Sequence, residues 1–143
     1  LLRIGWVYGA QGHNFVKAIL RLAAEREELR VVDDQYGSPS WTRDISGAMI
    51  ALIRNACDGV YHFSNEGVAS RYDFATAIVD IAKHLGAELR ITRIIPVASE
   101  DYPSAARRPL YSVLSKSKIR PVLRHGIPHW RTSLKKMLGE VYS

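Results

Sequence analysis

The chain passes from a strand into a helix through Asp33-Asp34-Gln35-Tyr36-Gly37-Ser38-Pro39-Ser40-Trp41-Thr42-Arg43-Asp44. The β-branched pair Val31-Val32 before it is typical of a strand end. Within the stretch, Gly37 can adopt a positive φ and Pro39 fixes its own φ, so the connection is a shaped turn. Ser40 is the expected N-cap of the following helix, because its hydroxyl can accept a hydrogen bond from a free helical N–H.

This connection has two interpretations. Its amide, hydroxyl, indole and guanidinium groups lie at a helix N-terminus, where a polar or anionic ligand can bind. An ordinary connection whose polar side chains face water accounts for the same residues. From the connection alone, the ordinary connection is the slightly favoured interpretation.

Outward from this connection, the apolar patterns predict an α/β fold. Short apolar or β-branched runs are expected as strands over residues 1–7, 29–33, 60–64 and 89–97. Apolar residues at helical spacing predict helices between and after them. Their expected start signals are His13 or Asn14, Ser40, a capping box of Ser70 and Asp73, and Pro128.

Size and composition indicate one globular domain. The chain has 143 residues, of which 47% are hydrophobic and 24% charged, enough to bury a sizeable core. A net charge of +6 would suit an anionic ligand, but the charges alternate in sign along the helices, so nucleic-acid binding is not expected. No apolar run approaches the roughly 20 residues of a membrane span. The single Cys57 has no disulfide partner, which favours a reducing compartment, the cytoplasm.

The chain opens inside an expected strand and has no initiator Met. A natural protein rarely begins within a buried element, so we expect these residues to be cut from a longer protein. If the strands at 1–7 and 60–64 belong to a larger sheet, they leave an unpaired edge and an uncovered apolar face. Such a surface favours association, for example into a homodimer.

Three places in the sequence carry groups that could bind a ligand. Trp6 lies near the carboxyl end of the first strand, where ligands bind in open α/β sheets, and its ring could form a wall against a sugar or base. A core tryptophan is the equal alternative. Gln35 belongs to the connection described above. Arg107 and Arg108 before Pro109 could bind phosphate oxygens, or could be a solvated surface pair. The sequence contains no recognisable catalytic triad, metal-ligand cluster or glycine-rich phosphate loop.

Five motifs occur in a fixed order along the chain. They are Gly-Trp-Val-Tyr-Gly (5–9), His-Asn-Phe-Val-Lys (13–17), Asp-Asp-Gln-Tyr-Gly-Ser-Pro-Ser (33–40), Gly-Val-Tyr-His-Phe-Ser-Asn-Glu-Gly (59–67) and Ala-Arg-Arg-Pro-Leu-Tyr-Ser (106–112). Together they resemble the carboxyl-terminal half of the dTDP-4-dehydrorhamnose reductases, over nearly the whole chain. That family belongs to the extended short-chain dehydrogenases, which have an amino-terminal Rossmann domain with a GxxGxxG loop and a Tyr-x-x-x-Lys pair. A smaller domain binds the nucleotide sugar.

The resemblance implies a fold and a domain assignment. Residues 1–143 would be a small mixed α/β substrate-binding domain together with late strands of a Rossmann sheet. The amino-terminal NADPH-binding domain would lie outside this chain, because neither of its motifs is present. The chain alone is therefore expected to bind no NADPH or NADH and to be inactive.

The resemblance also implies a reaction and a set of binding residues. In the family, a hydride passes from NADPH to the C4 ketone of dTDP-4-dehydro-β-L-rhamnose and gives dTDP-L-rhamnose, for cell-wall or surface polysaccharide. Trp6 matches the tryptophan that lies against the sugar. Matching positions around the dTDP-sugar cleft, with the arginines as candidates for the pyrophosphate, are Asn14, Phe15, Gln35, Gly37, Pro39, Arg107 and Arg108. No catalytic, cofactor-binding or metal-binding residue is matched.

A function of another class shares this fold. The regulatory subunit of methionine adenosyltransferase also resembles these reductases, so the chain could be a binding module without turnover. The glycine loop and the Tyr-x-x-x-Lys pair upstream of Leu1 would distinguish the enzyme from the scaffold.

Overall fold

The computed structural model describes residues 1–102 and 108–142. The first half of the chain contains β1 (Leu2–Ile4), β2 (Val7–Tyr8), α1 (Phe15–Glu25), β3 (Glu28–Val32), β4 (Tyr36–Gly37), β5 (Ser40–Trp41), α2 (Thr42–Arg54) and β6 (Tyr61–Phe63). The second half contains β7 (Ala69–Ser70), α3 (Arg71–His84), β8 (Arg93–Val97), the 3₁₀ turns η1 (Ser99–Asp101) and η2 (Arg120–Val122), and α4 (Trp130–Val141).

The strands form short pairs. β1 pairs with β6, β2 with β5 and β3 with β8, all in parallel, whereas β4 and β7 are antiparallel. Parallel pairs joined through helices, with one antiparallel pair among them, make a mixed α/β fold. The expected fold class is thereby confirmed.

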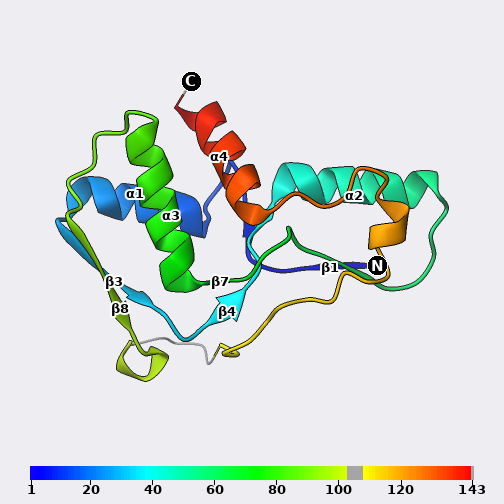
Figure 1. Cartoon of the computed structure of the whole chain (residues 1–143), viewed down its shortest axis with the longest axis horizontal. Coiled ribbons are helices and arrows are strands. Elements are labelled where there is room, and N and C mark those ends of the chain that lie inside the picture. Colours follow the sequence, from blue (N-terminus) through cyan, green and yellow to red (C-terminus); the bar gives the residue numbers. More distant parts are fainter. Residues whose placement is uncertain (103–107, 143) are drawn as a thin grey trace.

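The larger core lies where α1, α3 and α4 come together beside β3 (Figure 1). Most of its buried side chains come from these three helices, where helical spacing gathers them on one side, and Leu29 and Val31 of β3 also belong to it. Its fully buried members include Val16 of α1, Phe74 and Ile78 of α3, and Trp130 and Leu134 of α4.

A smaller core lies under α2, at the end of the molecule that also holds the amino terminus and lies opposite β3 and β8 (Figure 1). Ile45, Ala48 and Leu52 of α2 pack there with Phe63 and Ile119. The apolar stripe of this helix is wider than its buried face, because Met49 and Ile53 are exposed.

The prediction of a single strand over residues 1–7 was wrong in one respect. The structure divides it into β1 and β2, and Trp6 between them has φ 49°. This left-handed conformation cannot continue a strand and is unfavourable for a residue with a Cβ. Before the break the chain pairs with β6, and after it the chain pairs with β5.

Two expected helix starts are confirmed and two are wrong. Asn14 caps α1, and Ser70 forms the capping box of α3 with Asp73. Ser40 does not cap α2: its Oγ donates to the carbonyl of Ser38, and Trp41 takes the N-cap position without a side-chain bond. Pro128 is also not the first helical residue, because α4 begins two residues later with His129 as its N-cap.

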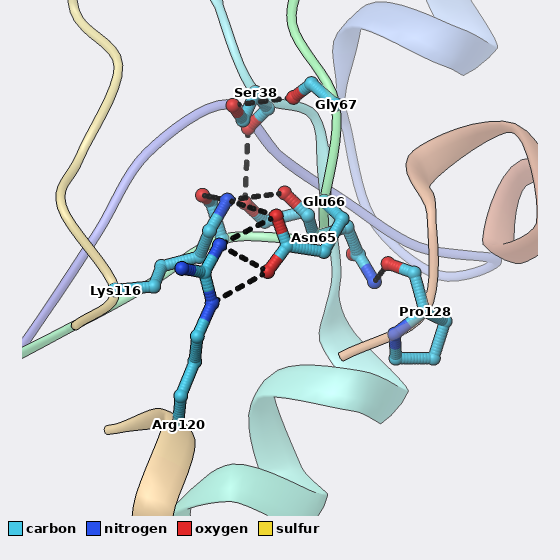
Figure 2. A network of polar contacts seen from close by, with 9 residues as sticks. Ser38, Asn65, Glu66, Gly67, Lys116, Arg120 and Pro128 are labelled. Atoms are coloured by element: carbon cyan, nitrogen blue, oxygen red, sulfur yellow. Dashed lines mark hydrogen bonds and ion pairs between the residues drawn. The ribbon is translucent and has the colours of Figure 1, made fainter. Parts of the chain in front are cut away.

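A partly buried polar network joins the loop after β6 to the carboxyl-terminal third of the chain. Lys116 donates to the carbonyl of Asn65 at 3.1 Å and pairs with Glu66 at 3.2 Å. Arg120 reaches the same carboxylate from η2, and Figure 2 shows both cations directed at Glu66. The amide of Asn65 donates to the carbonyl of Pro128 at 3.1 Å. These bonds hold the segment after residue 112 against the rest of the fold.

No helix in the described part of the chain is long and apolar enough to cross a membrane.

Candidate functional site

A pocket of about 410 Å³ lies where β2, the 35–37 segment, α3 and the 108–112 segment meet. Its lining residues come from sequence positions more than a hundred residues apart, and they are Trp6, Val7, Phe15, Gln35, Arg71, Phe74, Arg108, Pro109 and Ser112. The size is within the range of clefts that bind small molecules, and the mixture of aromatic and cationic groups suits an anion with an apolar or sugar part.

Trp6 is held in the pocket from several sides. Its indole Nε1 donates to the Ser112 hydroxyl at 3.2 Å, and this hydroxyl in turn donates to the carbonyl of Tyr36 at 3.1 Å. The edge of the indole lies against Gly37, where an added Cβ would approach the ring within 2.3 Å. The left-handed backbone of Trp6 is thus compensated by contacts that fix its ring.

Aromatic rings form the floor of the pocket. The ring of Phe74 is central: Phe15 stacks on it at 5.6 Å between ring centroids, and Trp6 lies at 6.5 Å. Beneath it, Tyr8 packs at 5.4 Å and Trp130 meets it edge-on at 5.7 Å. This cluster makes the pocket floor part of the larger core and therefore rigid.

Two arginines supply the positive charge. The guanidinium carbon of Arg71 lies 4.4 Å from the Trp6 ring centroid and 5.2 Å from that of Phe15. Burial lowers the pKa of Arg71, and the charge of Arg108 lowers it further. Among the described residues, no carboxylate forms an ion pair with either arginine. Two neighbouring cations without a counter-ion attract an anion.

The structure brings together half of the site residues expected from the sequence. Trp6, Phe15, Gln35 and Arg108 line the pocket. Gly37 lies behind the indole and leaves room for it. Arg107 falls outside the described residues.

Asn14 and Pro39 do not line the pocket. The Asn14 side chain caps α1: its Oδ1 accepts from the Lys17 N–H at 3.2 Å and its Nδ2 donates to the carbonyl of Gly9 at 2.9 Å. Pro39 is fully buried beside β5. In the structure these two residues shape the elements around the pocket.

Arg71 and Ser112 are pocket residues that the sequence did not predict. Arg71 directly follows the capping serine of α3, and no periodicity connects it to Trp6. One sequence feature could have pointed to Arg71. The helix α3 begins directly after a turn that follows a strand, and ligands bind at the carboxyl ends of strands in open α/β sheets. Ser112 is the last residue of a motif, and nothing in the sequence relates its hydroxyl to an indole.

The described residues contain no group of three His, Cys, Asp or Glu side chains that could hold a metal ion.

A sequence model of the family described as the RmlD substrate binding domain matches residues 1–143. The chain belongs to this family. The match covers every residue of the chain, so the five motifs and the fold built from them are features of this domain.

Curated relatives of this RmlD substrate binding domain come from several bacteria. The spore coat polysaccharide biosynthesis protein SpsK of Bacillus subtilis is 44% identical over 142 residues, which are 98% of this chain and 47% of the relative. The dTDP-4-dehydrorhamnose reductase of Escherichia coli is 34% identical over 148 residues, covering all of this chain and 50% of the relative. The chain thus spans about half the length of these relatives.

Solved structures give the same result. A dTDP-4-dehydrorhamnose reductase from Bacillus anthracis in complex with NADP matches with a TM-score of 0.88 and 36% identity, over 97% of this chain and 47% of that one. A UDP-glucuronic acid 4-epimerase from Bacillus cereus, at 18% identity and a TM-score of 0.68, shares the fold. None of these relatives supports the alternative of a methionine adenosyltransferase regulatory subunit.

Proposed function

We propose that this chain is the nucleotide-sugar-binding part of a longer reductase that converts dTDP-4-dehydro-β-L-rhamnose to dTDP-L-rhamnose with NADPH. The longer protein would carry an amino-terminal NADPH-binding domain, and β1 and β6 would be late strands of its sheet. Reductases named for this substrate that match across the whole chain support the proposal.

The observation that carries the proposal is the convergence of three distant motifs in one pocket. Trp6, Gln35 and Arg108 lie far apart in sequence, yet all of them line the same 410 Å³ cavity. An indole gives a flat wall for a sugar, and guanidinium groups bind phosphate oxygens in two-pronged geometry. A dTDP-sugar has both of these parts.

The glycine-bounded turn at 9–12 does not fit the role of an NADPH phosphate site. A phosphate-binding turn needs free N–H groups at a helix start. The glycine-bounded turn at 9–12 leads into α1, but the Asn14 side chain already accepts a hydrogen bond from the first turn of that helix. The proposal places the NADPH site, which supplies the hydride when the cofactor is bound, in the amino-terminal domain of the longer protein.

The test of the proposal is the affinity of dTDP for the full-length protein that contains this chain. Calorimetry should detect binding, and Arg108→Ala should weaken it by one to two orders of magnitude, because losing a charge-assisted hydrogen bond costs about 1.5–3 kcal/mol. Arg124→Ala, which removes an exposed arginine outside this pocket, is the control. No dTDP binding by the parent protein would overturn the proposal.

Trp6→Ala tests the sugar wall in the same protein. We expect it to reduce turnover of the nucleotide sugar much more than NADPH binding. Removing a packed tryptophan can also destabilise the fold by about 3–5 kcal/mol, so thermal melting is measured beside the kinetics. A lower melting temperature with unchanged substrate affinity would assign Trp6 to packing alone.

A further inference from the structure

No hydrogen-bonding or ionic partner among the described residues accounts for the position of the Arg71 side chain. Arg71 is the first residue of α3, and its backbone N–H donates to the carbonyl of Gln35 at 3.1 Å. Its side chain forms no hydrogen bond or ion pair with any described residue. The nearby acid of the helix, Asp73, is already used, because its carboxylate accepts from the Ser70 N–H in the capping box. Within the described part of the chain, this partly buried guanidinium thus keeps its N–H donors available.

The aromatic rings fix the orientation of this guanidinium without using its donors. A guanidinium over an aromatic face is held by the ring quadrupole, and its N–H groups then point outward in the plane of the stack. The contacts with the Trp6 ring at 4.4 Å and the Phe15 ring at 5.2 Å hold the Arg71 guanidinium at the pocket and leave its N–H donors without an acceptor among the described residues.

Arg71 and Arg108 also repel each other. Burial and the charge of Arg108 both lower the pKa of Arg71, so the two neighbouring cations lie in the pocket at a cost in stability. A diphosphate ester, each phosphate of which carries one negative charge, would remove the repulsion and satisfy both sets of donors.

We infer that Arg71 binds the diphosphate of the nucleotide sugar together with Arg108, and that Trp6 and Phe15 hold its guanidinium in position for this contact. This inference rests on the proposed function. It assigns to Arg71 a binding role that no motif of the sequence indicates. The Trp6 ring would then serve two purposes, since it supports the diphosphate-binding guanidinium on one face while its edge is anchored to Ser112.

The experiment measures dTDP affinity of the full-length protein over a series of salt concentrations, for wild type, R71M, R71K and R131M. Methionine keeps a long side chain that packs on aromatic rings but carries no charge. R131M is a matched control, because Arg131 also lies 4.4 Å over a tryptophan ring, that of Trp130, but does not line the pocket.

We expect R71M to weaken dTDP binding about ten- to hundredfold at low salt and to make the salt dependence shallower, since one ionic contact is lost. R71K should keep the steeper salt dependence and lose less affinity, while R131M should stay within twofold of wild type. Without ligand, R71M should melt no lower than wild type, because it removes the repulsion from Arg108.

Several results would overturn the inference. Binding of dTDP by R71M within twofold of wild type would show that Arg71 only covers the rings. Equal losses in R71M and R71K with unchanged salt dependence, or a lowered melting temperature in R71M with proportionate loss of binding, would assign Arg71 to packing. Failure of the wild type to bind dTDP is a different outcome, because it removes the proposed function itself.

Discussion

The indole of Trp6 lies directly against the α-carbon of Gly37. A Cβ added at Gly37 would come within 2.3 Å of Cε2, 2.4 Å of Nε1 and 2.8 Å of Cζ2 of this ring. Gly37 is not among the glycines with a positive φ. The glycine is therefore required for space, and the positive φ that its sequence context allows is not adopted.

Gly37→Ala should displace the Trp6 ring and break its bond to Ser112. We expect a loss of about 1–3 kcal/mol in the free energy of unfolding, as for other overpacked sites, and weaker dTDP binding. Chemical denaturation and calorimetry measure the two effects. Gly47→Ala in α2 is the control, because nothing lies within 4 Å of its added Cβ, and it should be neutral or stabilising. A Gly37→Ala protein with parental stability and affinity would contradict this packing.

Glu66 should make stability depend on pH. Burial alone would raise its pKa, but hydrogen bonds from Arg120 and Lys116 outweigh burial and leave the pKa below its usual value of 4.5. A lowered pKa in the folded state gives stability that is present above the unfolded pKa and is lost as the pH falls through the folded pKa.

Glu66→Gln should therefore cost about 1–3 kcal/mol at neutral pH, since Lys116 stays buried with a weaker partner. The difference from wild type should shrink below pH 4.5. Denaturation at a series of pH values measures it. Glu25→Gln removes one side of an exposed pair 3.9 Å from Arg21 and should change stability by less than about 1 kcal/mol. A Glu66 effect that is constant with pH would refute the electrostatic origin.

Ala56→Gly should stabilise the protein by about 0.5–1 kcal/mol. Helix α2 ends in a pair of capping bonds, from the N–H of Ala56 to Ile53 and from that of Cys57 to Leu52. This arrangement needs a left-handed residue at position 56, where alanine has φ 47°. Ala51→Gly within the helix should instead destabilise by about 1 kcal/mol. Thermal melting compares the two, and destabilisation by both would show that the left-handed geometry carries no cost.

The exposed apolar surface beside α2 should cause association of this chain when it is isolated. Leu1 and Ile53 are 77% and 75% exposed, and Met49 is 48% exposed. Ile53→Glu should reduce both dimer or aggregate formation in light scattering and the binding of a hydrophobic dye. Ser46→Glu on the same helix is the control for added charge. A monodisperse wild-type chain that excludes the dye would count against this role of the surface.

Local patterns predicted most of the elements. The capping box at Ser70 and the cap at Asn14 were predictable because their bonds join residues three apart. The failure of Ser40 to cap α2 was not predictable, because Ser40 belongs to β5, which pairs with β2, and its N–H donates to the carbonyl of Trp6, 34 residues away. The break at Trp6 also depends on distant contacts, since the preference of its own backbone opposes it.

The candidate site was predictable only as a set of motifs. Motif resemblance pointed to Trp6, Phe15, Gln35 and Arg108, and these line one pocket. It could not separate them from Asn14, whose side chain is used within the fold. Arg71 was missed because its position in the pocket follows from stacking between segments that no sequence spacing relates.

The hydrogen bond from Trp6 to Ser112 joins residues 106 positions apart. One part of the pocket lining thus comes from the first ten residues of the chain and another from the 108–112 segment. Bringing such distant segments together is entropically costly. A ligand that contacts both parts of the lining would stabilise the folded state of nearly the whole domain, and this stabilisation would be reversible. Binding of this ligand would therefore require a folded domain. Unfolding of either part of the lining alone would release the ligand.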